Sequence, residues 1–139
     1  RQKRIRRELV RMSTMGKFKG VTPRLLPRFL SPAALQNETL ASAVMAMGEA
    51  VGQHNFALQQ EAIMNRREQM GTLAQFHKPS LVLCGDLDEL TPPELAHEMA
   101  GVLRDAELVI LPDVGHLSAM EAPDEVTAAL LRLIDRIAT

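Results

Sequence analysis

The chain has 139 residues, of which 46% are hydrophobic and 24% are charged, and its formal net charge is -1. This composition is typical of a soluble globular chain of about one domain. A single cysteine, Cys84, excludes an intrachain disulfide, and no run of about 18 apolar residues is present to span a membrane, so we expect a reducing, cytoplasmic setting and no membrane partner.

Positive charge is concentrated at the start of the chain. Residues 1–30 contain ten lysines or arginines and one acid, Glu8, which gives +9, whereas the remaining 109 residues carry -10. A basic segment of this kind is able to neutralise phosphates or to lie on anionic lipid. Ile5, Leu9 and Met12 fall at helical spacing, so we interpret the basic residues as the solvated side of an amphipathic helix. Phosphate binding remains the alternative, and nucleic acid is not an expected partner.

Residues 1–76 have the pattern of successive helices and show no strand pattern. A threonine followed by a proline predicts the start of a short helix over residues 22–30. Asn37 is a suitable N-cap for the next helix, which we expect to end at Gly52. Further helical segments are expected up to residue 76.

The pattern changes after Pro79. A short apolar run without polar alternation covers residues 80–84 and is closed by Gly85, as in a strand that is buried on both faces. A second such run covers residues 108–111, and two prolines start a helix over residues 92–103 between the runs. Strand, helix and strand form a βαβ unit, whose right-handed crossover makes the two strands parallel.

The last helix is expected to begin at Pro123, with two acids in its first turn where carboxylates suit the helix dipole. Its predicted buried stripe consists of Val126, Leu130, Leu133, Ile134 and Ile137. Two parallel strands that are apolar on both faces need neighbouring strands on both sides. We therefore expect an N-terminal core segment or a second chain to complete the sheet.

Chemistry-bearing residues follow both predicted strands. In open parallel sheets, functional groups lie in the loops at the carboxyl ends of strands, and Asp88 and His116 occupy such loops. An acid and a histidine presented from adjacent strand ends are able to hydrogen-bond. The carboxylate then fixes the imidazole tautomer and stabilises the imidazolium that forms during acyl transfer. The sequence thus predicts Asp88 and His116 as catalytic residues.

These residues resemble the α/β-hydrolase family, whose acid lies in a strand-G-x-x-D-x-x-x-P pattern and whose histidine follows the last strand in a G-H pair. The matching positions are Gly85, Asp88, Pro92, Gly115, His116 and the E-x-P of residues 121–123. The resemblance implies an α/β fold in which residues 77–139 form the C-terminal part of the hydrolase core and residues 1–76 an all-helical cap. It implies hydrolysis of an ester or similar acyl bond in a small, largely apolar substrate, with Asp88 orienting His116 as general base and acid.

The sequence departs from the family at the nucleophile. No G-x-S-x-G motif surrounds any serine, namely Ser13, Ser31, Ser42, Ser80 and Ser118. We therefore expect the nucleophile to lie upstream of these residues and the 139-residue chain alone to be inactive. Cys84 falls within a buried strand, where a thiol behaves as a small apolar side chain, and is not expected to replace the serine.

No cofactor and no metal are expected. His54, His77 and His97 have no partner at metal-ligand spacing, and the segment around Asp86 and Asp88 lacks the glycine of a calcium loop. A different hypothesis also fits the pattern: a non-enzymatic, self-associating or partner-binding module that retains hydrolase-like loops.

Overall fold

The computed structural model describes residues 4, 6–8, 10–11 and 20–138. The chain divides into two compact units, one made of residues 1–26 and 42–68 and the other of residues 27–41 and 69–139. Each unit is considered by itself below. The division into a cap over residues 1–76 and a core over residues 77–139 stays a prediction.

In the first unit, the described residues that form regular structure are helical. The described residues between positions 4 and 11 are helical, while Ile5, Leu9 and Met12, which suggested an amphipathic helix, lie outside the described residues. Within this unit, the Arg6 guanidinium donates a hydrogen bond of 2.7 Å to the side chain of Gln60. One of the basic side chains therefore has an internal partner.

Helix α2 (Glu38–Asn65) begins at the predicted cap, because the Leu40 N–H donates to Asn37 Oδ1 at 3.1 Å. The expected end at Gly52 is a kink: this residue has φ 70° and ψ 165°, and helical geometry resumes directly after it. Glycine adopts a positive φ without steric cost, so the kink coincides with the residue that broke the pattern. No helix in the described part of the chain is long and apolar enough to cross a membrane.

The helix expected over residues 22–30 is wrong. The N–H groups of Leu25 and Leu26 both donate to the Thr22 carbonyl, at 2.8 and 3.2 Å, and a single turn of 3-10 helix, η1 (Leu26–Arg28), follows. Pro27 has no N–H to donate, so an α-helix cannot continue through it with full bonding. A second 3-10 turn, η2 (Ala34–Gln36), was not predicted.

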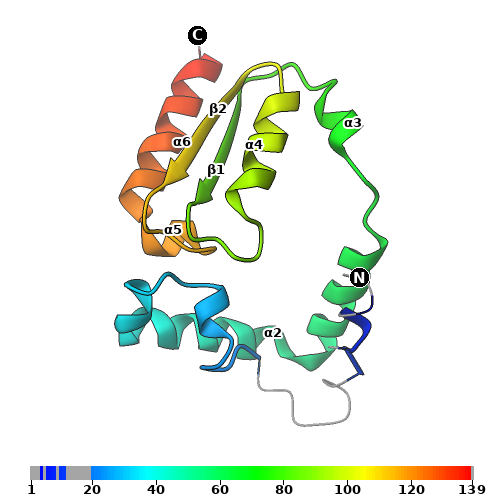
Figure 1. Cartoon of the computed structure of the whole chain (residues 1–139), viewed down its shortest axis with the longest axis vertical. Helices are drawn as coiled ribbons and strands as arrows, with labels where there is room; N and C mark the ends of the chain where they lie inside the picture. The colour runs from blue at the N-terminus through cyan, green and yellow to red at the C-terminus, as the bar shows by residue number, and fades with distance from the viewer. Residues whose placement is uncertain (1–3, 5, 9, 12–19, 139) are drawn as a thin grey trace. The chain divides into compact units, whose positions relative to one another are not determined.

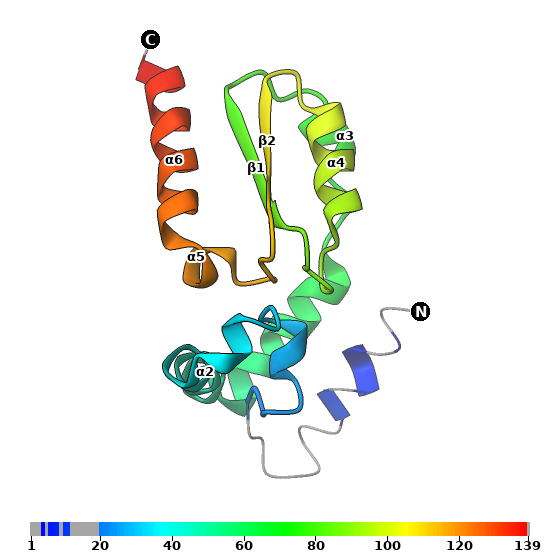
Figure 2. The ribbon, with the colours of Figure 1, turned by 60° about the vertical axis from the view of Figure 1, so that its left-hand side comes forward.

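The second unit contains the βαβ core. Its remaining elements are α3 (Met70–Leu73), β1 (Ser80–Gly85), α4 (Pro93–Val102), β2 (Ala106–Leu111), α5 (Ser118–Glu121) and α6 (Pro123–Ala138). Strands β1 and β2 pair in parallel, as predicted, with Ser80 opposite Ala106 and Gly85 opposite Leu111. Helix α4 covers one face of this pair and α6 the other (Figures 1 and 2).

Alternate strand residues supply two small cores. On the α4 side, Val82 and Cys84 pack with Ala96. On the α6 side, Leu111 packs with Ala122, and partly buried strand residues add to this cluster. Because side chains alternate along a strand, an uninterrupted apolar run fills both cores at once. The two strands therefore lie between two helices, and the carboxyl ends of both strands lie at the same edge of the sheet.

The predicted stripe of α6 is only partly buried. Val126 and Leu133 are half-buried, whereas Leu130, Ile134 and Ile137 are 47%, 57% and 63% exposed, so the prediction of a fully buried stripe is wrong for these three residues. The physical reason is geometric: the apolar face of α6 is wider than a two-stranded sheet can cover. Apolar surface therefore remains exposed on this helix.

Gly85 brings the end of β1 against the loop that follows β2. A Cβ at this position would lie 2.1 Å from the Val114 carbonyl oxygen and 2.5 Å from that of Gly115. Neither atom is a flexible side chain, so the backbone would have to move. The glycine at the end of the strand is therefore required by close approach of two loops.

We predict that Gly85→Ala lowers the free energy of unfolding by about 3 kcal/mol, because the added methyl group overpacks a backbone contact. Gly101→Ala is the matched control: it lies within α4, where an added Cβ meets nothing within 4 Å, and it should raise stability by about 0.5–1 kcal/mol. Urea unfolding of both variants measures the difference. Equal stabilities would contradict the proposed close approach.

Candidate active site

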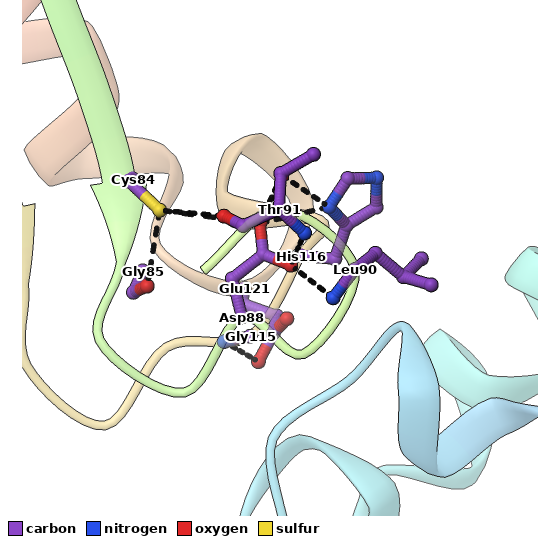
Figure 3. A network of polar contacts seen from close by, with 8 residues as sticks. All are labelled: Cys84, Gly85, Asp88, Leu90, Thr91, Gly115, His116 and Glu121. Carbon is purple, nitrogen blue, oxygen red and sulfur yellow. Dashed lines mark hydrogen bonds and ion pairs between the residues drawn. The ribbon is translucent and has the colours of Figure 1, made fainter. Parts of the chain in front are cut away.

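The loop after β1 folds around the carboxylate of Asp88, which is only 6% exposed. Its Oδ1 accepts hydrogen bonds from the N–H groups of Leu90, at 2.8 Å, and Thr91, at 2.9 Å. Its Oδ2 accepts one from the Thr91 hydroxyl at 2.8 Å. Figure 3 shows these donors gathered on one side chain. Asp88 is therefore the organising residue of its loop.

The surroundings of Asp88 favour its ionised form. Burial alone raises the pKa of this carboxyl, but the bonds from the Thr91 backbone, His116, the Thr91 hydroxyl and the Leu90 backbone lower it, and the net result is a lowered pKa. Hydrogen bonds to a carboxylate stabilise its charge, and here they outweigh desolvation. The group carries a negative charge at neutral pH.

The histidine loop after β2 turns back onto the acid loop. Asp113 has φ 60°, a left-handed conformation that aspartate tolerates better than most residues. The Val114 N–H then donates to Asp86 Oδ1 at 3.3 Å, and the Leu87 N–H donates to the Val114 carbonyl at 2.9 Å. Asp86 thus accepts a backbone hydrogen bond that joins the two loops.

Asp88 and His116 lie in direct contact. His116 Nδ1 is 2.8 Å from Asp88 Oδ2, and the imidazole side chain is 32% exposed while the carboxylate side chain is 5% exposed. An ionised carboxylate accepts a hydrogen bond from the Nδ1–H group, which leaves Nε2 as the nitrogen available for proton transfer. The structure therefore brings together the two residues that the sequence singled out. Their catalytic role stays a prediction.

Residues 29–31 hold the backbone of the histidine loop. The carbonyl of Phe29 accepts hydrogen bonds from the N–H groups of His116, at 3.0 Å, and Leu117, at 3.1 Å. The Phe29 ring also lies edge-on to the imidazole, with centroids 6.2 Å apart. Neither contact was foreseen from the sequence, because no motif marks residues 29–31. The histidine backbone is thus fixed by a segment far away in the chain.

Glu121 joins the same two segments through its side chain. Its Oε2 accepts hydrogen bonds from the N–H groups of Ser31, at 3.0 Å, and Gly115, at 3.1 Å. Its Oε1 is buried and has no hydrogen-bond partner among the described residues. The E-x-P motif drew attention to this residue, but only the structure gives it a role. Glu121 is a brace between residues 29–31 and the histidine loop.

Gly115 is required by this brace. A Cβ at Gly115 would lie 2.7 Å from the Ser31 nitrogen, 2.8 Å from Glu121 Oε1 and 2.9 Å from the Leu30 carbonyl carbon. The backbone of residues 30–31 and the Glu121 carboxylate therefore pack directly on its Cα. The close packing at this position therefore explains why a glycine precedes the histidine.

A pocket of about 510 Å³ lies beside the acid loop within the second unit. Its walls combine apolar and acidic side chains, among them Leu30, Pro32, Leu35, Leu87, Asp86 and Glu89. Asp88 also lines it. The pocket has the mixed character of a small-molecule site, with apolar walls and a few polar groups.

Cys84 lies beneath the acid loop as a neutral thiol. The side chain is buried, and its Sγ is 3.9 Å from Asp88 Oδ2 and 3.5 Å from the Thr91 carbonyl oxygen. Burial, and then the nearby Asp88 carboxylate, raise the pKa of the thiol. Because the thiolate is the nucleophilic form, this environment disfavours nucleophilic chemistry at Cys84.

The site contacts described above involve no histidine other than His116. His54, His77 and His97 are exposed. Within the described part of the chain, no group of three histidine, cysteine, aspartate or glutamate side chains is arranged to hold a metal ion.

The chain is similar in sequence to a protein family and to two lipases. Residues 55–132, more than half of the chain, match the family model described as TAP-like protein. Lipase 1 of Psychrobacter immobilis is 34% identical over 68 residues, which cover 49% of this chain and 22% of the lipase. Lipase 3 of Moraxella sp. is 31% identical over 65 residues, which cover 47% of this chain and 21% of that lipase.

Solved structures resemble nearly the whole chain. A thermophilic esterase from Thermogutta terrifontis superimposes with a TM-score of 0.89 and 26% identity, covering 99% of this chain and 51% of the esterase. A hydrolase from Pseudomonas aeruginosa gives a TM-score of 0.84 and 25% identity, covering 95% of this chain and 50% of that protein. The chain therefore spans about half the length of these structures, and its match to each lipase covers about a fifth of that lipase.

We predict that Glu121→Ala lowers the free energy of unfolding by about 2–4 kcal/mol, because it leaves two buried N–H groups without an acceptor. Glu98→Ala, at an exposed position of α4, should change it by less than about 0.5 kcal/mol. Thermal and urea unfolding of both variants test this. A loss no larger for Glu121→Ala than for Glu98→Ala would rule out the brace.

The lowered pKa of Asp88 predicts a specific acid sensitivity. A depressed folded-state pKa contributes stability that is present above the ordinary value of 3.8 and is lost as the pH falls through the folded pKa. Asp88→Asn removes this contribution, so the stability gap between wild type and variant should be largest near neutral pH and shrink below about pH 4. Urea unfolding at a series of pH values measures the gap, and a constant gap would contradict the assignment.

Proposed function

Because the chain belongs to the α/β-hydrolase family, we propose that it forms part of an enzyme that hydrolyses an ester or similar acyl bond. In this proposal, His116 is the general base and acid, and Asp88 orients it. The observation that carries the proposal is the 2.8 Å contact between His116 Nδ1 and Asp88 Oδ2, made by two loops at the same edge of the sheet. The role of each residue then follows from its chemistry.

The carboxylate of Asp88 accepts a hydrogen bond from the Nδ1–H group, so the proton stays on Nδ1 and Nε2 of His116 carries a lone pair. Nε2 removes the proton of a serine hydroxyl as that oxygen attacks the acyl carbon, and the resulting imidazolium is stabilised by Asp88. The imidazolium then gives its proton to the departing alcohol. Water repeats the two steps on the acyl-enzyme, which releases the acid and restores the serine.

The serine belongs to a part of the fold outside these 139 residues, since none of the serines here lies in a G-x-S-x-G motif. The donors that stabilise the oxyanion belong outside as well. The chain spans about half the length of the solved hydrolases that it resembles, which supports this assignment. In this proposal the chain contributes the histidine that transfers protons and the aspartate that orients this histidine.

The substrate that we propose is a small, largely apolar ester or related acyl compound. The similar proteins include two lipases and an esterase, and the leucine and proline side chains in the wall of the pocket beside Asp88 suit such a molecule. No metal or other cofactor enters this mechanism.

We further propose that an N-terminal core segment of the same protein, or a second chain, completes the sheet. A two-stranded parallel sheet is marginal by itself, and the exposed apolar residues Leu130, Ile134 and Ile137 of α6 offer a surface that further strands would cover. Burial of this surface would stabilise the assembled fold.

We predict that His116→Gln lowers kcat for a short-chain p-nitrophenyl ester by about 10³–10⁴-fold in the protein that carries this chain. His97→Gln is the matched control, because His97 is exposed on α4 and outside the site, and it should retain wild-type kcat. Steady-state kinetics on folded protein, checked by circular dichroism, gives both values. Retention of activity in His116→Gln would refute the proposed role.

The completed sheet makes a separate prediction. Ile134→Lys should lower the free energy of unfolding of the protein that carries this chain by about 2–4 kcal/mol, because a lysine would replace an apolar side chain in a buried contact. Ala128→Lys, at an exposed position of α6 about 120° around the helix from Ile134, should change it by less than about 0.5 kcal/mol. If both variants were equally stable, the face of α6 would be open to solvent and the proposal wrong.

A further inference from the structure

Thr91 contacts both members of the proposed acid and histidine pair. Its hydroxyl donates to Asp88 Oδ2 at 2.8 Å, and the same oxygen lies 3.4 Å from His116 Nδ1. Its backbone N–H donates to Asp88 Oδ1 at 2.9 Å. The residue therefore contacts both carboxylate oxygens as well as the imidazole (Figure 3).

The Thr91 hydroxyl shares the Oδ2 atom of Asp88 with His116. This oxygen receives two donors, His116 Nδ1 and the Thr91 hydroxyl, both at 2.8 Å, which match its two lone pairs. Rotation of the carboxylate about its Cβ–Cγ bond would break both contacts and the two bonds to Oδ1 together. The backbone donors of Leu90 and Thr91 hold one oxygen. Apart from His116 and the Cys84 thiol, whose Sγ is 3.9 Å away, the Thr91 hydroxyl is the donor to the other oxygen.

We propose that Thr91 is a positioning residue, which acts through Asp88 to keep Oδ2 aimed at His116 and the carboxylate ionised. The inference rests on the proposed function, since it assigns a further residue to the same site. The hydrogen bond from the Thr91 hydroxyl to the ionised carboxylate is short, as strong hydrogen bonds to charged groups are. The contact between the same hydroxyl and His116 Nδ1 is long, at 3.4 Å, and therefore contributes less.

Other titratable groups surround the pair and could compete with this role. They are Cys84 from β1, Asp86 and Glu89 from the acid loop, Glu94 from α4 and Glu121 from α5. Four of these are acids, whose negative charge would disfavour ionisation of a neighbouring carboxyl. The donors of Thr91 work in the opposite direction. A variant that changes only Thr91 leaves all of these groups in place, so it isolates the contribution of the hydroxyl.

The test replaces Thr91 with valine, which keeps the shape of the side chain and removes the hydroxyl. Loss of the whole acid function of a triad costs about 10⁴-fold in kcat, so loss of one of the four short nitrogen and oxygen donors to Asp88 should lower kcat by about tenfold with little change in KM. Thr91→Ser restores the hydroxyl and should recover most of that loss. Thr127→Val, on α6 and outside the site, should match wild type.

A second readout follows the carboxyl directly. In a ¹³C NMR titration, Asp88 should become protonated at higher pH in Thr91→Val than in wild type, because the ionised form loses a donor. Thr91→Ser should return the titration towards that of wild type. A merely structural role for Thr91 would change the midpoint of unfolding without moving this titration in the folded protein.

The two readouts separate the inference from the proposed function. If wild type does not hydrolyse esters but the Asp88 titration still moves in Thr91→Val, the proposed function fails and the hydrogen-bonding role of Thr91 remains. If Thr91→Val titrates like wild type and keeps its kcat, the positioning role of Thr91 is overturned.

Discussion

The carboxylate of Asp88 is the point at which the acid loop and the histidine loop are tied together. It accepts two backbone N–H groups, one hydroxyl and one imidazole nitrogen, and each donor holds a different part of the site. A buried charge is stable only when it is well paired, so the loop must keep all four donors near it. The ordered shape of this loop, the ionised state of the acid and the orientation of His116 therefore have one common cause.

The parallel register makes this arrangement possible. Gly85 is opposite Leu111, so the acid loop and the histidine loop leave the sheet at the same level. The lack of a side chain at Gly85 and Gly115 then lets backbone segments approach to distances that a Cβ would forbid. Loop geometry thus depends on two glycines as much as on the residues that carry charge.

The sequence predicted those features that depend on local pattern or on strand order. Uninterrupted apolar runs identified both strands, and their order with the intervening helix predicted the parallel βαβ unit that brings Asp88 near His116. Two predictions from the sequence were wrong. The helix over residues 22–30 does not form because Pro27 interrupts it, and part of the apolar face of α6 is exposed because burial of that face depends on how many strands cover it. The contacts of Phe29 and Glu121 were out of reach because each joins segments far apart in the chain through backbone groups, which leave no sequence pattern. A contact between Thr91 and Asp88 could have been predicted because the two residues are close in sequence. Their spacing does not show which oxygen of the carboxylate accepts the hydrogen bond from the hydroxyl.

The brace between Ser31 and Glu121 has a consequence for the order in which the molecule assembles. Its two ends are 90 residues apart, whereas the bond between Asp88 and His116 spans 28. Closing a longer loop costs more chain entropy, although the cost grows only slowly with length. Contacts of large sequence separation also tend to form late in folding. The strands and the acid loop are therefore expected to form first, and the histidine backbone is secured only when residues 29–31 return to it.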